Sequence, residues 1–132
     1  MSKLTEQGMA TRRSVLGDVH VDKAEANKSD FDVEFQAMIT DGAWGRVWSG
    51  DHWSKRERSM VTIALLAGLG HYEEMAMHIK ATVRTGASRE DVKEALLHVA
   101  IYAGVPHANH AIKIAKEAFA EMDKAEQKGD NK

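Results

Sequence analysis

The spacing of apolar residues along the chain predicts an all-α protein. Apolar side chains recur every three or four residues over most of the sequence, and no segment alternates apolar and polar residues as a half-buried strand would. A first helix is expected over residues 4–16, interrupted by Gly8 and closed near Gly17. Residues 18–28 are expected to form a polar connection.

The pattern continues with two further helices. Ser29 or Asp30 is expected to cap the first of them, which ends near Gly42 and has an apolar face made of Phe31, Phe35 and Met38. Residues 42–53 are rich in glycine and tryptophan and are expected to form a connection. Residues 55–69 are apolar on nearly every side after a charged first turn, which is typical of a buried helix.

Turn and capping residues mark the boundaries that follow. A helix is expected from His71 to about Thr85, with Gly86 as its C-cap. Ser88 and Asp91 then form the pattern of a capping box that opens the next helix. This helix should bury a stripe that consists of Val92, Ala95, Leu96, Val99 and Ala100.

The last helix should begin at Pro106, because proline suits a first helical turn. Its apolar positions are Ala108, Ile112, Ala115, Phe119 and Met122. With this element the sequence predicts one domain over residues 1–132, a bundle of six to seven helices. Residues 1–28 would be its N-terminal helix and loop, and residues 124–132 a polar, frayed tail.

Composition narrows the function classes. The 132 residues carry a net charge of −2 with both signs interspersed, which does not suggest a partner among nucleic acids or membranes. The N-terminus lacks a hydrophobic leader and the longest apolar run is too short to span a bilayer, so a cytoplasmic location is expected. The chain has no cysteine, which excludes disulfides, thiolate metal sites and a cysteine nucleophile. Residues 64–69 and 96–102 offer more apolar surface than one small bundle buries, which predicts a homo-oligomer.

His71, Glu74 and His78 form the first candidate site, because positions i, i+3 and i+7 share one face of a helix. An imidazole and a carboxylate side by side can act as a general acid–base pair, since imidazole titrates near neutrality. The same face could instead be solvent-exposed, with Glu74 favouring the start of a helix. A third interpretation is a metal site to which His107 and His110 add ligands, although the spacing matches no standard ligand motif.

Other candidate residues surround this pattern. His98 lies in an apolar helix, where a structural role and a catalytic role both remain open. Trp44 and Trp48, four residues apart, could be a core pair or a wall of the substrate site. His20 is expected on a loop that could close over a site, and His107 begins a helix, the end that attracts anions.

Five segments together resemble the carboxymuconolactone decarboxylase family, in the expected order and spacing. They are LGDVHVDKA (16–24), WGRVW (44–48), KRERSM (55–60), EEMAMHIKA (73–81) and LLHVAIYAGVP (96–106). The resemblance covers essentially the whole chain. It implies the all-α fold of alkyl hydroperoxidase D, a homo-oligomer (trimer or hexamer), and Glu74 and His78 as catalytic residues. In the peroxidase relative, a glutamate, two cysteines and a histidine would match Ser59, His71, Glu74 and His78, so the absence of cysteine argues against peroxidase activity.

The resemblance also implies a reaction that needs no cofactor. The family's substrate, a lactone carboxylate, loses carbon dioxide from a carbon that is conjugated to the lactone carbonyl, so the substrate accepts the electron pair itself. Glu74 and His78 would protonate the ring or stabilise the developing enolate. His71, His20, Trp44, Arg46, His98 and His107 are the expected substrate-binding residues, with Arg46 or His107 holding the acetate arm. A metal-binding module or a non-catalytic oligomeric relative are the alternatives.

Overall fold

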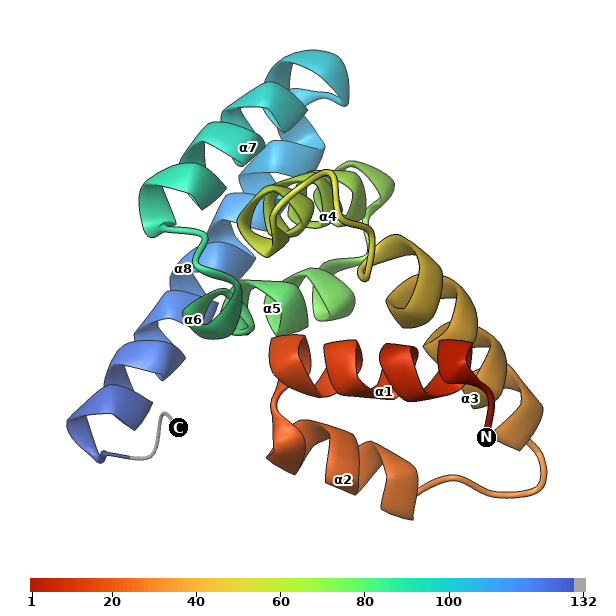
Figure 1. Ribbon diagram of the computed structural model, residues 1–132. Coiled ribbons are helices and arrows are strands. Elements are labelled where there is room, and N and C mark those ends of the chain that lie inside the picture. Colours follow the sequence, from red (N-terminus) through yellow and green to blue (C-terminus); the bar gives the residue numbers. More distant parts are fainter. Residues whose placement is uncertain (130–132) are drawn as a thin grey trace. The chain divides into compact units, whose positions relative to one another are not determined.

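The computed structural model describes residues 1–129 and confirms the all-α prediction. These residues form eight α-helices and one π-helical segment, η1, which is more than the six to seven helices expected. Figure 1 shows the helices in chain order. Their contacts divide the chain into two compact units, Met1–Lys55 and the residues from Arg56 onward. A single domain over residues 1–132 stays a prediction.

The first unit contains four elements: α1 (Lys3–Leu16), α2 (Asp18–Ala26), α3 (Val33–Ile39) and η1 (Thr40–Val47). The prediction of a polar connection over residues 18–28 is wrong, because α2 occupies most of this segment. Gly17, at a φ of 89°, turns the chain after α1, and α2 then packs on α1 through Val21, its only buried residue. One buried residue leaves no apolar stripe in the sequence, which explains why the periodicity did not predict this helix.

A second difference concerns residues 29–47. The helix that follows Ser29 is short, and its expected apolar face is not buried: Phe31 precedes α3 and is 97% exposed, and Phe35 and Met38 are also exposed. The expected connection over residues 42–53 instead begins as η1, in which each N–H bonds five residues back, as Trp48 N does to the Ala43 carbonyl at 2.8 Å. The buried residues of this segment are Thr40, Trp44 and Gly45, so η1 rather than α3 forms the core here.

Gly8 does not interrupt α1, but lets it approach η1 closely. A Cβ atom at Gly8 would lie 2.2 Å from the Thr40 carbonyl oxygen, and one at Gly45 would lie 2.9 Å from the Leu4 carbonyl oxygen. Gln7 bridges the same crossing, since its side-chain amide donates to the Gly45 carbonyl at 2.9 Å. The two glycines therefore set the distance between these elements.

We expect Gly8→Ala to destabilise the first unit by about 1–3 kcal/mol, because the new methyl group meets backbone that cannot move aside. Helix propensity alone would stabilise α1 by about 1 kcal/mol. The sign of the change in the free energy of unfolding therefore shows whether the steric clash or the helix propensity dominates. Urea denaturation followed by tryptophan fluorescence measures it, since all three tryptophans lie in residues 1–55. Gly42→Ala is the matched control, because a Cβ there meets nothing within 4 Å.

The second unit is built around α4 (Lys55–Leu69), α5 (Tyr72–Lys80), α6 (Thr82–Thr85), α7 (Arg89–Tyr102) and α8 (Val105–Gln127). Its core joins buried residues of α4, α5, α7 and α8, among them Ile63, Met75, Ile79, Val92 and Ala111. Buried alanines line α8, namely Ala108, Ala111, Ala115 and Ala118, whereas Ile112 is exposed. The expected stripe is thus confirmed at Ala108 and Ala115, and Phe119 and Met122 pack against the core partly buried, whereas Ala111 and not Ile112 faces the core in the second turn.

Most expected boundaries of this unit are confirmed. Gly86 ends α6 in the left-handed region, Ser88 and Asp91 form the capping box, and Pro106 lies in the first turn of α8. The helix expected from residue 71 to 85 divides near Ala81 into α5 and α6. The tail expected to fray from residue 124 is helical as far as Gln127, and residues 130–132 lie outside the described part. Every helix within residues 1–129 is too short or too polar to cross a membrane.

A bidentate ion pair joins the starts of α4 and α7. Arg56 Nε and Nη2 donate to the two carboxylate oxygens of Asp91 at 2.8 and 2.7 Å, while one of those oxygens also accepts from the Ser88 backbone N–H at 2.9 Å. The Arg56 guanidinium, followed by the Ser88 hydrogen bonds, lowers the pKa of Asp91 from 3.8 to about 2. The folded state therefore favours the ionised carboxylate more than the unfolded state does.

We expect Asp91→Asn to make the free energy of unfolding fall less steeply as the pH is lowered below about 4. Because the folded pKa is depressed, the contribution of Asp91 is complete above about pH 4 and disappears as the pH falls toward 2. Ion pairs with Lys80 and Arg89 also lower the pKa values of Glu121 and Asp123, so the wild type alone does not isolate Asp91. The contribution of Asp91 is isolated by comparing the urea midpoints of the wild type and Asp91→Asn. Circular dichroism measures both midpoints at pH 7 and at pH 2.5. An unchanged difference at the two pH values would refute this assignment.

Candidate functional site

His78 is the buried histidine of the predicted site. It lies in the last turn of α5 and is 7% exposed. Its neighbours along the helix, Met75 and Ile79, are fully buried in the core of the second unit, and they fix the rotation of α5. A buried imidazole at the margin of an apolar core is shielded from bulk water, so its polar interactions are screened less than those of an exposed side chain.

Glu74 and His71 are placed differently. Glu74 lies one turn before His78, about 40° away around the helix, but its side chain is exposed and makes no hydrogen bond or ion pair with residues 1–129. His71 precedes α5 as its N-cap residue, where its N–H donates to the Leu66 carbonyl at 2.8 Å. The helical-face argument therefore holds for Glu74 and His78, whereas His71 lies on the turn before them.

A pair of buried hydroxyls supports the region behind α5. Thr85 Oγ1 donates to Ser59 Oγ at 3.0 Å, which joins α6 to the fully buried Ser59 of α4. Thr82 Oγ1 donates to the Ile79 carbonyl at 2.6 Å and ties the end of α5 to α6. Ser59 stands where the peroxidase relative would carry a glutamate, so at this position the chain holds a neutral hydrogen bond instead of an ionisable group.

Two further histidines lie at the turn between α4 and α5. His107 Nε2 is 3.6 Å from the position that a Cβ on Gly70 would take, and the His110 ring lies against Tyr72 with centroids 4.2 Å apart. The first turns of α8 thus contact the residues on either side of His71. Nowhere in residues 1–129 do three or more histidine, aspartate or glutamate side chains gather in an arrangement that could hold a metal ion.

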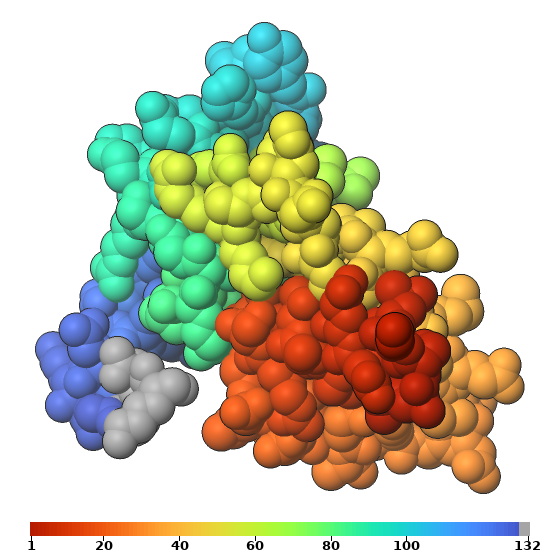
Figure 2. All heavy atoms as spheres, viewed as in Figure 1, coloured from red at the N-terminus to blue at the C-terminus, as the bar shows by residue number. Residues whose placement is uncertain are grey.

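His98 lies at a separate apolar groove between α4 and α7. The groove has a volume of about 350 Å³ and its walls include Leu65, Leu69 and Tyr102. The rings of His98 and Tyr102 are nearly parallel, with centroids 6.3 Å apart. Tyr102, the last residue of α7, is exposed. The segment in which α7 gives way to α8 lies at the top of Figure 2.

The remaining predicted residues belong to the first unit. Trp44 and Trp48 are buried and pack on each other, with ring centroids 5.3 Å apart. Arg46 is exposed on η1 between them. His20 is exposed too, but it lies on α2 and not on the expected loop.

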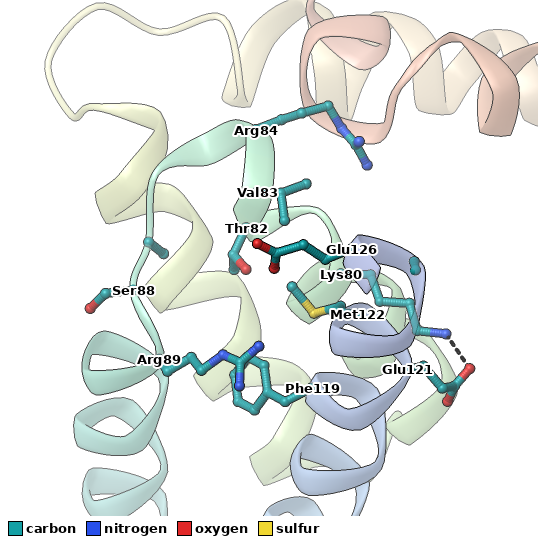
Figure 3. A pocket seen from close by; sticks show the side chains of 12 residues that line it. Lys80, Thr82, Val83, Arg84, Ser88, Arg89, Phe119, Glu121, Met122 and Glu126 are labelled. Carbon is teal, nitrogen blue, oxygen red and sulfur yellow. Dashed lines mark hydrogen bonds and ion pairs between the residues drawn. The ribbon is translucent and has the colours of Figure 1, made fainter. Parts of the chain in front are cut away.

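A further cavity of about 570 Å³ lies in the second unit between α6, the start of α7 and the C-terminal part of α8 (Figure 3). Its charged side chains largely pair with one another or with neighbours: Lys80 with Glu121 at 2.9 Å, and Arg89 with Asp123 at 2.6 Å. Arg89 also lies 4.6 Å above the Phe119 ring. None of the residues predicted for the site lines this cavity.

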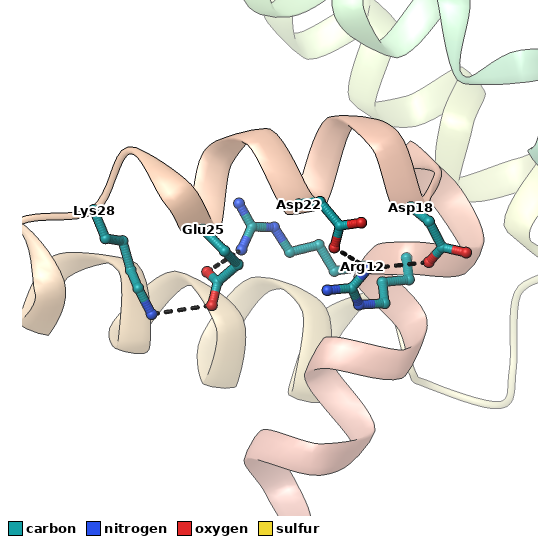
Figure 4. Close-up of polar contacts among 6 residues, drawn as sticks. Arg12, Asp18, Asp22, Glu25 and Lys28 are labelled. Atoms are coloured by element: carbon teal, nitrogen blue, oxygen red, sulfur yellow. Dashed lines mark hydrogen bonds and ion pairs between the residues drawn. The ribbon is translucent and has the colours of Figure 1, made fainter.

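Sequence reasoning missed two features that bear on the site. The Ser59–Thr85 hydrogen bond could have been suspected, because Ser59 is a polar residue on an otherwise apolar helix face. Arg12 of α1 (Figure 4) is the second: it is a buried arginine, only 5% exposed, beside the half-buried Arg13. Charged residues at neighbouring positions give no sequence signal for which of them is buried.

Comparisons with known proteins agree on one family. Residues 34–117, more than half of the chain, match the model of the carboxymuconolactone decarboxylase family. A 4-carboxymuconolactone decarboxylase of Acinetobacter baylyi is 40% identical over 123 residues, which cover 93% of this chain and 92% of that relative. The nitrosuccinic acid decarboxylase npaB of Metarhizium robertsii is 32% identical over 127 residues, which cover 96% of this chain and 89% of that relative. A 4-carboxymuconolactone decarboxylase of Pseudomonas putida is 52% identical over 40 residues, which are 30% of this chain and 83% of that relative.

Proposed function

The chain belongs to the carboxymuconolactone decarboxylase family, and we propose that it converts 4-carboxymuconolactone to 3-oxoadipate enol-lactone and carbon dioxide. This reaction would serve the breakdown of aromatic compounds through protocatechuate and β-ketoadipate. The observation that carries the proposal is the 40% identity to a 4-carboxymuconolactone decarboxylase along nearly the full length of both chains. The absence of cysteine excludes the thiol chemistry of the peroxidase relative.

The substrate supplies its own electron acceptor. The bond between the ring γ-carbon and the carboxylate breaks, carbon dioxide leaves, and the electron pair passes through the double bond to the lactone carbonyl. The resulting enolate then takes up one proton on carbon. The enzyme has to stabilise the enolate oxygen, deliver that proton and exclude water from the departing carboxylate.

We assign the proton delivery to His78, or to His78 and Glu74 together. The burial of His78 supports this assignment, because an imidazole in a partly dry site donates a hydrogen bond that solvent does not weaken. Glu74 shares the helical face of His78 and would orient it or relay the proton. Contacts to the rest of the substrate are proposed for His71, His20, Trp44, Arg46, His98 and His107.

A second candidate function follows from the relative whose name gives nitrosuccinic acid as its substrate. The two substrates share two features. Each carries a carboxylate whose loss leaves a carbanion stabilised by an acceptor, a conjugated lactone in one and a nitro group in the other. Each also carries a second carboxylate that the decarboxylation retains.

The direct test offers the purified protein freshly prepared 4-carboxymuconolactone and, separately, nitrosuccinate, and follows the release of carbon dioxide. We expect rapid release from the lactone and a smaller kcat/KM for nitrosuccinate. A reversed preference would transfer the proposal to the second substrate, and no release from either would refute both. A parallel assay with a chelator is expected to give the same rate, since the chemistry requires no metal.

The same proposal includes a homo-oligomer, a trimer or hexamer, that works in the cytoplasm. Large apolar side chains are exposed on α4, α7 and α8, with Tyr102 85% exposed, and α4 buries only Ser59, Ile63 and Ala67. The prediction of a buried helix over residues 55–69 thus holds for one face of α4 and is wrong for the other in the isolated chain. Contact with other copies would cover this surface, and sedimentation equilibrium measures the mass of the assembly.

A further inference from the structure

The apolar groove between α4 and α7 is lined in part by small residues. They are Ala64 and Gly68 of α4 and Ala103, which follows α7, and a volume of about 350 Å³ stays open beside them. A Cβ atom on Gly68 would lie 3.3 Å from the Ala103 Cβ, so these segments approach each other closely. The sequence thus leaves a hollow on this face that none of the three small residues can fill.

Large apolar side chains project beside the same hollow. Leu65 and Leu69 of α4 are 59% and 66% exposed, and Tyr102 of α7 is 85% exposed. Among residues 1–129, no lysine, arginine, aspartate or glutamate lines the groove. A charged partner would find no opposite charge here, and the centres of protein–protein interfaces are likewise depleted in charged residues. The occupant that fits this face is therefore itself apolar.

The exposed apolar surface extends beyond the groove within the second unit. It continues with Val61 one turn earlier on α4, with Leu97 and Ile101 on α7, and with Val105 at the start of α8. Together with the groove walls, these side chains expose on the order of 800 Å², about the area that each partner buries in an interface of standard size. This extent exceeds the largest apolar patch of a typical monomer. The face therefore has the area that a stable contact between proteins needs.

We infer that a second copy of this chain covers the groove, and that the two copies meet through this same face around a two-fold axis. The inference rests on the homo-oligomer of the proposed function and names its contact surface. Hollow and projecting side chains lie on one face, so each copy offers what fills the hollow of the other. A two-fold axis satisfies both copies at once, because every contact then occurs twice. A small apolar ligand would fill the hollow but would leave Ile101 and Val105 in water.

This symmetry distinguishes between the two assemblies proposed above. A cyclic trimer has a three-fold axis alone, whereas a hexamer can consist of two trimers that two-fold axes relate to each other. A two-fold contact at the groove therefore selects the hexamer. His98 lines the same groove, so in this hexamer it lies where two copies meet, and it reaches a substrate only at that contact.

The test places a charge in the groove and measures the mass of the assembly. Sedimentation equilibrium should give a hexamer for the wild type and a trimer for Leu65→Glu, because a carboxylate that is buried without a partner destabilises the contact. Val83→Glu is the matched control. Val83 is 54% exposed on α6, outside the groove, and its variant should keep the wild-type mass. If circular dichroism shows that Leu65→Glu is unfolded, Tyr102→Glu places the charge on the other wall and takes its place.

The outcomes separate this contact from the rest of the proposed function. A wild-type trimer, or a hexamer that Leu65→Glu leaves intact, would overturn the inference while the homo-oligomer stands. An equal loss of mass in Val83→Glu would also overturn it, because the added charge would then act without regard to the groove. A wild type without decarboxylase turnover whose mass is still halved by Leu65→Glu would refute only the activity. A monomeric wild type would refute both the homo-oligomer and this contact.

Discussion

Replacement of His78 by glutamine is expected to lower kcat for 4-carboxymuconolactone by about 10²–10⁴, the usual contribution of general acid–base catalysis. Glutamine keeps the approximate size of the ring and one hydrogen-bond donor, but it cannot give up a proton to the enolate. The effect should fall on kcat more than on KM, because protonation and enolate stabilisation occur after binding. Steady-state kinetics with the lactone measure both constants.

Two controls separate a chemical effect from a structural one. His78 is buried, so its substitution can also destabilise the second unit, and thermal unfolding followed by circular dichroism must show a folded variant at the assay temperature. His52→Gln removes an exposed histidine that has no assigned role and should leave kcat within about twofold of the wild type. A folded His78→Gln variant with wild-type turnover would remove His78 from the mechanism.

The fold was predictable where the sequence contains strong local signals. Gly86, the Ser88–Asp91 capping box and Pro106 each act within one helical turn, and all three lie where they were expected. The elements that were missed or misplaced lack such signals. The helix α2 depends on one buried valine, and η1 follows a hydrogen-bond pattern whose side-chain period differs from the 3.6 residues assumed for a helix.

The candidate site was predictable in part, for a related reason. Periodicity places Glu74 and His78 on one face, but it does not reveal that one is exposed and the other buried, since burial depends on distant residues of α4, α7 and α8. His71 was predicted to lie in the same helix. It precedes α5, because Gly70, at a φ of 78°, interrupts the helical backbone just before it. The contrast between Arg12 and Arg13 likewise arises from packing and from the positions of three acidic residues on α2.

Glu74 requires a sharper experiment, because its position allows two explanations. The side chain lies in the first turn of α5, where a carboxylate is favoured by the helix dipole whether or not it takes part in chemistry. Glu73 occupies the same turn, is equally exposed, and differs only in direction: it lies about 140° around the helix from His78, whereas Glu74 lies about 40° away. Glu73→Gln is therefore a control matched in charge, exposure and helical position.

We expect Glu74→Gln to lower kcat by about 10²–10⁴ if the carboxylate relays the proton, and Glu73→Gln to remain within about twofold of the wild type. Both variants should lose similar, small amounts of stability, because each removes one first-turn charge. If both lose activity equally, the helix dipole accounts for the effect and Glu74 has no part in proton transfer. If neither does, His78 acts without this carboxylate. The pH dependence of kcat/KM distinguishes the two roles of Glu74. If the profile of Glu74→Gln alone lacks one of the two limbs, Glu74 is a titrating member of the pair. A carboxylate that only positions His78 would lower kcat/KM at every pH alike.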